Sequence, residues 1–200
     1  MLIRYLSDLH LEFIKPNKIL FFMKKIKPKK DEVLVLAGDV GYPHSQNYDI
    51  FMKFANEHFR KTFVIAGNHE YYSKCTKPFQ EINNHMREYF TQYENISFLD
   101  NQSEIYDNYC FIGTTLWSHI SNSTYEINDV YQIHDFDYIK YNKLNKDCVE
   151  FLNDEITKHD KNIVITHHLP SPQLIDSKYK TSKMVPYNQW FYCDMDEFIK

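Results

Sequence analysis

Three short apolar stretches of this chain end in the same way, each running straight into a polar motif. The stretches are "IRYLS", "EVLVLAG" and "TFVIAG", and the motifs that close them read "SDLHLE", "LAGDVG" and "GNHEYY". Short runs rich in Val, Ile and Leu that stop at Gly, Asp or Asn are typical of strands. Three strands that end alike could bring their polar ends together in one site.

Further strands are predicted at "NISFLD", "YCFIGTTLW" and "NIVITH", with apolar residues at helical spacing between the strands. They form three sets: Tyr48, Phe51, Ala55 and His58 or Phe59; Phe79, Ile82, Met86 and Phe90; and Leu144, Cys148, Phe151, Leu152 and Ile156. Strands that alternate with amphipathic helices indicate an α/β layered fold. Stretch 118–141 shows no clear period, so we expect a long loop or short helical turns there.

Composition places the chain among globular proteins. Its 200 residues, 43% hydrophobic and 25% charged, can bury a substantial core, and we expect one domain over residues 1–200. A net charge of −4 gives no overall attraction to nucleic acid or an anionic membrane. "MLIRYLSDLH" carries an Arg and an Asp where a signal peptide is apolar, and the four cysteines form no CxxC pair. We therefore expect a cytoplasmic protein with reduced thiols and no membrane partner.

Side chains that can bind metal ions follow the predicted strands, where ligands collect in open α/β sheets. They are Asp8 and His10, Asp39, Asn68 and His69, and His167 and His168. If the chain stays extended, Asp8 and His10 leave it on the same face and can hold one cation. Asp39 has two oxygens that can bridge a pair of cations. The side-chain oxygen of Asn68 and an imidazole suit the second cation. Gly38 and Gly67 let the backbone turn sharply before the ligands.

Each motif alone also has an ordinary structural role. A D-x-H triplet is common at surfaces and helix caps, and Gly-Asp is a frequent turn. The Asn and His of "GNHE" could cap a helix, and Pro170 of "THHLPS" could simply force the chain out of a strand. All of the motifs in this order, each at the end of a predicted strand, favour a shared site.

"SDLHLE", "LAGDVG", "GNHEYY" and "VITHHLPS" resemble the successive motifs of the calcineurin-like metallophosphoesterase superfamily, over the chain from Leu6 to about Pro172. The resemblance implies a four-layer α/β sandwich of two mixed sheets flanked by helices, with two metal ions at the strand ends. It implies that Asp8 and His10 bind the first ion, that Asp39 bridges, and that Asn68 and His167 bind the second. His167 is preferred over His168 because, by family alignment, it comes directly off the strand.

The same resemblance gives His69 a catalytic role facing the leaving-group oxygen. Hydrolysis of a phosphomonoester or phosphodiester needs a nucleophile at neutral pH and a positive group that absorbs the developing negative charge of the phosphate. Two metal ions with a bridging hydroxide supply both. His69 would then protonate the departing alkoxide, with Glu70 or a neighbouring carbonyl orienting its ring. Mixed oxygen and nitrogen ligands suit manganese, iron or zinc better than magnesium or calcium.

The motif series lacks its last member. The family closes with Gly-His-x-His, whose histidines complete the two metal sites, but the last glycine here is Gly113 and the last histidine is His168. "CDMDEFIK" opens like a helix and stops at Lys200. We therefore expect a C-terminally truncated member without its last strands. Asp194, Asp196 or Glu197 could replace the missing ligands, or could be ordinary acidic residues at a helix start.

A second class of function follows from the missing histidines. The chain could be a catalytically impaired or non-catalytic scaffold with the same fold. The intact motifs favour the enzyme. Its phosphorylated substrate is not encoded in a readable motif, and nucleic acid enters the prediction only as a substrate.

Overall fold

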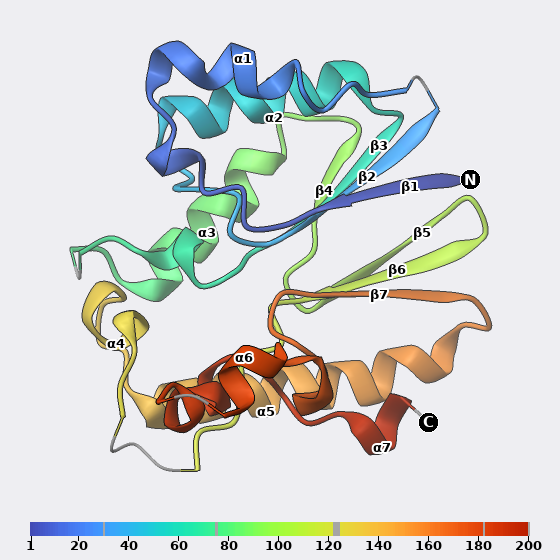
Figure 1. Cartoon of the computed structure of the whole chain (residues 1–200). Helices are drawn as coiled ribbons and strands as arrows, with labels where there is room; N and C mark the ends of the chain where they lie inside the picture. The colour runs from blue at the N-terminus through green and yellow to red at the C-terminus, as the bar shows by residue number, and fades with distance from the viewer. Residues whose placement is uncertain (30, 75, 122–124, 182, 200) are drawn as a thin grey trace.

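The computed structural model describes residues 1–29, 31–74, 76–121, 125–181 and 183–199, and it contains two β-sheets with helices outside them (Figure 1). The first sheet has the strand order β1-β2-β3-β4 and the second has the order β5-β6-β7. The predicted α/β fold with two sheets flanked by helices is confirmed.

The first sheet is parallel throughout, so the expectation that both sheets are mixed was wrong for this one. It consists of β1 (Leu2–Leu6), β2 (Glu32–Ala37), β3 (Lys61–Ile65) and β4 (Ile96–Phe98). Between its strands run α1 (Ile19–Met23), α2 (Gln46–His58) and α3 (Phe79–Phe90), which lie over the outer face of this sheet (Figure 1). Parallel strands require such crossovers, so the carboxyl ends of β1, β2 and β3 all reach the same edge.

The second sheet is mixed and holds a strand that the sequence did not predict. β5 (Gln102–Tyr106) pairs antiparallel with β6 (Tyr109–Thr114), and β6 pairs parallel with β7 (Asn162–Thr166). The two turn residues between β5 and β6, Asp107 and Asn108, have φ values of 52° and 65°. Asp and Asn tolerate this left-handed conformation, which a tight hairpin turn requires.

Helices cover the outer face of the second sheet as well (Figure 1). They are α5 (Tyr138–Glu155), α6 (Ser177–Lys180) and α7 (Asp196–Ile199), while α4 (Asn128–Gln132) lies at the strand-end side. α5 begins within stretch 118–141, where loop or short turns were expected, because Asp137 caps it by accepting a hydrogen bond from the Lys140 amide at 2.8 Å. Asp194 accepts from the Asp196 amide at the start of α7, the capping role that we weighed against metal binding.

A dry apolar layer joins the two sheets. It is made by Val33, Val35, Phe63, Ile65, Leu99, Phe111 and Ile165. Phe63 of β3 and Phe111 of β6 stack at its centre, with ring centroids 4.0 Å apart. Each sheet also buries its other face against helices, which explains why β2 and β3 read as continuous apolar runs.

The predicted helix faces are buried as expected, with Tyr48, Phe51 and Ala55 on α2 and all four predicted positions of α3. Cys110, Cys148 and Cys193 are buried free thiols, as predicted, whereas Cys75 lies outside the described residues. Within the described part of the chain, no helix has the length and apolar character needed to span a membrane.

Replacing Phe63 by Ala removes one of the two stacked rings between the sheets. We expect the free energy of unfolding to fall by about 3–5 kcal/mol, because the cavity cannot close without moving both sheets. Urea denaturation followed by circular dichroism measures this loss. Phe21→Ala, at an exposed position of α1, should change the value by less than about 0.5 kcal/mol; equal losses would show that Phe63 is not central to the core.

Candidate functional site

The chain after β1 runs alongside the chain after β2, and the two are joined by backbone hydrogen bonds beyond the sheet. The amide of Asp8 donates to the carbonyl of Gly38 at 3.1 Å, and that of His10 donates to the carbonyl of Asp39 at 3.0 Å. β1 ends at Leu6, and Asp8, His10 and Asp39 all have left-handed φ values, of 54°, 46° and 51°. The backbone at Asp8 and His10 is therefore not extended, so the condition under which both side chains would leave the strand on one face is not met. The paired loops nevertheless bring the ligand atoms of all three residues within 4.8 Å of one another.

Glu70 joins the loops that follow β2 and β3. Its buried carboxylate accepts hydrogen bonds from the amides of Asp39 at 3.0 Å, Val40 at 2.7 Å and Gly67 at 2.7 Å, and a longer one from Gly41 at 3.3 Å. Burial and the neighbouring Asp39 carboxylate raise the pKa of Glu70 to about 7, against the effect of the amide donors. Glu70 is therefore engaged with the backbone. Of the two groups considered for orienting His69, Glu70 or a neighbouring carbonyl, Glu70 does not take that role.

His167 lies against two glycines at the end of β7. A Cβ on Gly38 would come within 2.6 Å of His167 Nδ1, and one on Gly67 would come within 2.7 Å of His167 Cε1. Gly38 also has a φ of +85°, so it fits the turn role that was expected, whereas Gly67 is needed for space. His167 Nδ1 donates to the carbonyl of Ala37 at 3.0 Å. In a neutral imidazole, Nε2 is then the nitrogen that carries the lone pair.

His167 Nε2 points at the side-chain oxygen of Asn68, 3.1 Å away. The Asn68 amide group is oriented by Asp129, because Nδ2 donates to Asp129 Oδ1 at 2.7 Å. Asp129 is buried and also accepts from the hydroxyls of Tyr72 at 2.6 Å and Tyr141 at 3.1 Å. Burial raises the pKa of Asp129 in spite of these donors. Asn68 therefore presents its oxygen to His167, and two lone pairs that face each other need a cation or a proton between them.

The two oxygens of Asp39 face different partners. Oδ2 lies 3.9 Å from His10 Nε2, and Oδ1 lies 3.4 Å from His167 Nε2. The amide of His69 also donates to Oδ1 at 2.9 Å, which holds the carboxylate in this orientation. Two donor sets result, Asp8 with His10 on one side and Asn68 with His167 on the other, and Asp39 contributes to both.

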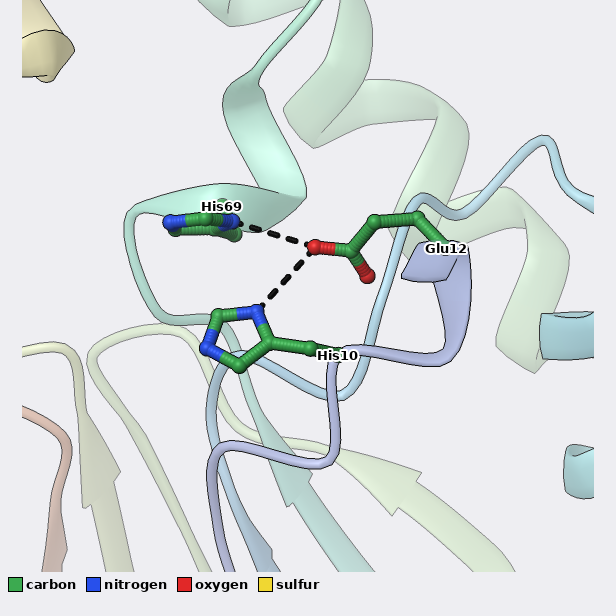
Figure 2. Close-up of side chains that lie close together, drawn as sticks. All are labelled: His10, Glu12 and His69. Carbon is green, nitrogen blue, oxygen red and sulfur yellow. Dashed lines mark hydrogen bonds and ion pairs between the residues drawn. The ribbon is translucent and has the colours of Figure 1, made fainter. Parts of the chain in front are cut away.

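Glu12 holds two imidazoles with one oxygen (Figure 2). Its Oε1 lies 3.1 Å from His10 Nδ1 and 3.1 Å from His69 Nδ1. An ionised carboxylate only accepts hydrogen bonds, so each Nδ1 donates and each Nε2 is turned away from Glu12. Sequence reasoning assigned Glu12 no role, although it stands two residues after His10 in "SDLHLE".

Electrostatics reinforce this arrangement. Burial works against ionisation of Glu12, but hydrogen bonds from His69, its own backbone and His10 outweigh it and lower the pKa of Glu12. Burial likewise disfavours a charged His69, yet the hydrogen bond to Glu12 and the nearby Asp39 raise the pKa of His69. The ring of Tyr72 stacks on His69 with centroids 4.2 Å apart, which fixes the ring plane.

His168 lines a cavity together with the donor sets, but its hydrogen-bond and stacking partners are buried residues. Its Nδ1 lies 3.3 Å from Ser118 Oγ and its ring stacks on Tyr141, and burial lowers the pKa of His168 well below its usual range. Tyr71 and Trp117 are buried core residues.

The donor sets open into a cavity of about 590 Å³. Asp8, His10, Asp39, Asn68, His69 and His167 all line it, so the structure brings the sequence-predicted site residues together on one surface. An α/β sandwich with carboxylate, amide and imidazole donors at the carboxyl ends of its strands is the architecture of a metallophosphoesterase.

Comparison with known proteins agrees with this class. The model of the calcineurin-like phosphoesterase family matches residues 1–192. An uncharacterized protein of Acanthamoeba polyphaga mimivirus is 32% identical over 193 aligned residues, covering 84% of this chain and 68% of that protein. The chain therefore belongs to the calcineurin-like phosphoesterase family, as the resemblance of its motifs predicted.

The fold also matches a solved structure. The crystal structure of a phosphopantetheinyl hydrolase from Mycobacterium tuberculosis covers 96% of this chain and 76% of its own length, with a TM-score of 0.69 and 13% sequence identity. This likeness supports the shared two-sheet fold. Family membership supports metal-dependent hydrolysis of a phosphoester in general terms.

Glu70→Gln keeps the size of the side chain but turns an amide NH₂ toward backbone donors. We expect the free energy of unfolding to fall by about 2 kcal/mol or more, because at least one buried backbone N–H loses its acceptor. Urea denaturation of the metal-free chain measures the change. Glu88→Gln, at an exposed position of α3, is the matched control and should be neutral; a neutral Glu70→Gln would show that the loops hold together without this carboxylate.

Proposed function

We propose that this chain hydrolyses a phosphomonoester or phosphodiester with two divalent metal ions held at the ends of β1, β2, β3 and β7. Asp8 and His10 would hold the first ion, Asn68 and His167 the second, and Asp39 both. The observation that carries the proposal is the orientation of Asp39, whose two oxygens face His10 and His167 separately.

The donor sets fit metal ions on structural grounds. Asn68 Oδ1 and His167 Nε2 face each other as acceptors, because Asp129 and the carbonyl of Ala37 engage their donor groups. Oxygen and imidazole nitrogen in both sets suit manganese, iron or zinc. Such a pair of ions lowers the pKa of water and stabilises negative charge on a phosphate in the transition state.

The chain's own residues supply proton transfer and orientation. His69 lines the cavity with its Nδ1 held by Glu12, so Nε2 is the atom placed to give a proton to the leaving-group oxygen. Glu12 orients His69 and His10 together, and Asp129 orients the Asn68 oxygen. Phosphate binding and protonation of the leaving group would thus take place on one rigid edge of the sheets.

Asp39→Asn should remove both metal sites at once, because a neutral amide binds one ion weakly and cannot bridge two. We expect the metal content after dialysis to fall from two ions per chain to one or none, and kcat/KM for a p-nitrophenyl ester to fall by at least about 100-fold. Elemental analysis and a manganese-supplemented hydrolysis assay measure the two effects.

The control is Asp147→Asn, at an exposed position of α5, which should keep both the metal and the activity. Unchanged hydrolysis in Asp39→Asn would identify a contaminating enzyme and overturn the proposal. Fewer than two ions in the unaltered chain would contradict the dinuclear centre.

His69→Asn tests proton transfer through the choice of leaving group. A p-nitrophenolate leaves without protonation, whereas an alkoxide needs a proton, so the loss of kcat should be about 100-fold greater for an alkyl leaving group than for p-nitrophenyl. Glu12→Gln should also lower kcat more for the alkyl leaving group than for p-nitrophenyl, but by a smaller factor, because Glu12 acts through His69. Equal losses for both leaving groups would assign His69 to phosphate binding instead.

A further inference from the structure

The cavity is lined by the donor sets and by a mostly apolar wall that also includes Asp176 and Asn188. The apolar part is lined by Leu169, Leu174, Ile175, Tyr179, Met184 and Phe191. Leu174 is 58% exposed and Phe191 is 42% exposed. Large apolar side chains left open to solvent in a concave surface next to reactive groups are typical of a ligand site.

This wall is anchored to the rest of the molecule. The indole of buried Trp190 donates to the carbonyl of Tyr125 at 2.7 Å, and the carbonyl of Trp190 lies 3.3 Å from the hydroxyl oxygen of Tyr141. The amide of Leu169 donates to the carbonyl of Phe191 at 3.0 Å, and the amide of Cys193 donates to the carbonyl of Leu169 at 2.9 Å. The apolar surface is therefore formed in advance of ligand binding.

The cavity offers no cationic side chain for a second phosphate. Among its described lining residues there is no Lys or Arg, and Asp176 adds a carboxylate. Two nearby lysines are engaged locally: Lys178 Nζ lies 3.7 Å from Asp176 Oδ2, and Lys180 Nζ donates to the carbonyl of Gln173 at 2.9 Å. Nucleotide polyphosphates and nucleic acid require positive partners along their length, so this surface disfavours them.

A second apolar contact lies beside the donor sets. Phe13 is exposed, and its ring centroid lies 5.6 Å from that of His10 and 6.5 Å from that of His69. An apolar group bound near these imidazoles would therefore have an aromatic neighbour there too.

We propose that the substrate is an ester with a single phosphate whose substituent is apolar, alkyl or aryl, and that this substituent binds against Leu174, Tyr179 and Phe191. This inference rests on the proposed hydrolysis and narrows its substrate class. The phosphate would lie beside the donor sets and the apolar group against the apolar wall, in a cavity whose total volume of about 590 Å³ suits a small organic ligand.

Three phosphodiesters test the proposal. All three have p-nitrophenolate as the leaving group, and they differ only in the second ester group. This group is benzyl, methyl, or the 5′-linked residue of thymidine 3′-phosphate. With the manganese-loaded chain we expect kcat/KM to be about tenfold or more higher for benzyl than for methyl, because the ring is removed from water. The nucleotide ester should be the poorest of the three, because its second phosphate meets no cation.

Leu174→Ser should lower the benzyl-to-methyl ratio to about threefold, and Leu174→Ser with Phe191→Ser should bring it near one. Leu20→Ser is the matched control, since Leu20 is 62% exposed on α1 and does not line the cavity; it should leave the ratio unchanged. A ratio near one in the unaltered chain, or a preference for the nucleotide ester, would overturn the apolar class while leaving the hydrolase proposal standing.

Calorimetric titration measures the preference for a benzyl over a methyl ester group without turnover. We expect dibenzyl phosphate to bind at least about tenfold more tightly than dimethyl phosphate, and this advantage to fall in Leu174→Ser. No hydrolysis of any ester together with this binding preference would refute the proposed function and retain the apolar site. Equal binding of the two phosphates would refute the site itself.

Discussion

The buried carboxylate of Glu70 is the interaction on which the site depends. It accepts backbone hydrogen bonds from the loop after β2 and from the loop after β3, so it fixes the distance between them. Asp39 and Asn68 stand on those two loops, and His167 packs against a glycine of each. A buried acceptor surrounded by backbone donors cannot shift without leaving several N–H groups unpaired, which makes the ligand geometry a property of the backbone.

Two further carboxylates, Glu12 and Asp129, orient the side chains that face the cavity. Each engages the donor groups of its partners, Nδ1 of His10 and His69 for Glu12 and Nδ2 of Asn68 for Asp129. The opposite atoms, which carry the lone pairs or, in the proposed function, the transferable proton, are thereby turned toward the cavity. Some carboxylates would thus bind metal and others orient the ligands, which explains why the site contains more carboxylates than the proposed metal ligands alone require.

Sequence reasoning predicted that the candidate ligands lie together because they follow strands, and parallel strands deliver their carboxyl ends to one edge of the sheet. It also found the buried faces of α2 and α3. It missed β5, whose sequence "QSEIY" is a half-exposed edge strand without an apolar run, although Asp107 and Asn108 carried a turn signal. It missed Glu12 and misassigned Glu70, because hydrogen-bond partners are set by loop packing between distant segments. The left-handed backbone at Asp8 and His10 depends on the loop after β2 and leaves no local pattern.

The strained backbone and the facing acceptors have a common physical explanation. Asp8, His10 and Asp39 hold a left-handed conformation that costs a residue with a Cβ about 1 kcal/mol, and their ligand atoms converge although carboxylates repel one another. Folding alone does not favour such a cluster, whereas a cation between these candidate ligands would offset both costs. The surrounding hydrogen bonds of Glu70 and Glu12 keep the ligands in place before a cation arrives, so binding requires little rearrangement. With the proposed substrate, the apolar wall beside it would separate two tasks within one cavity, charge for the phosphate and dispersion for the group attached to it.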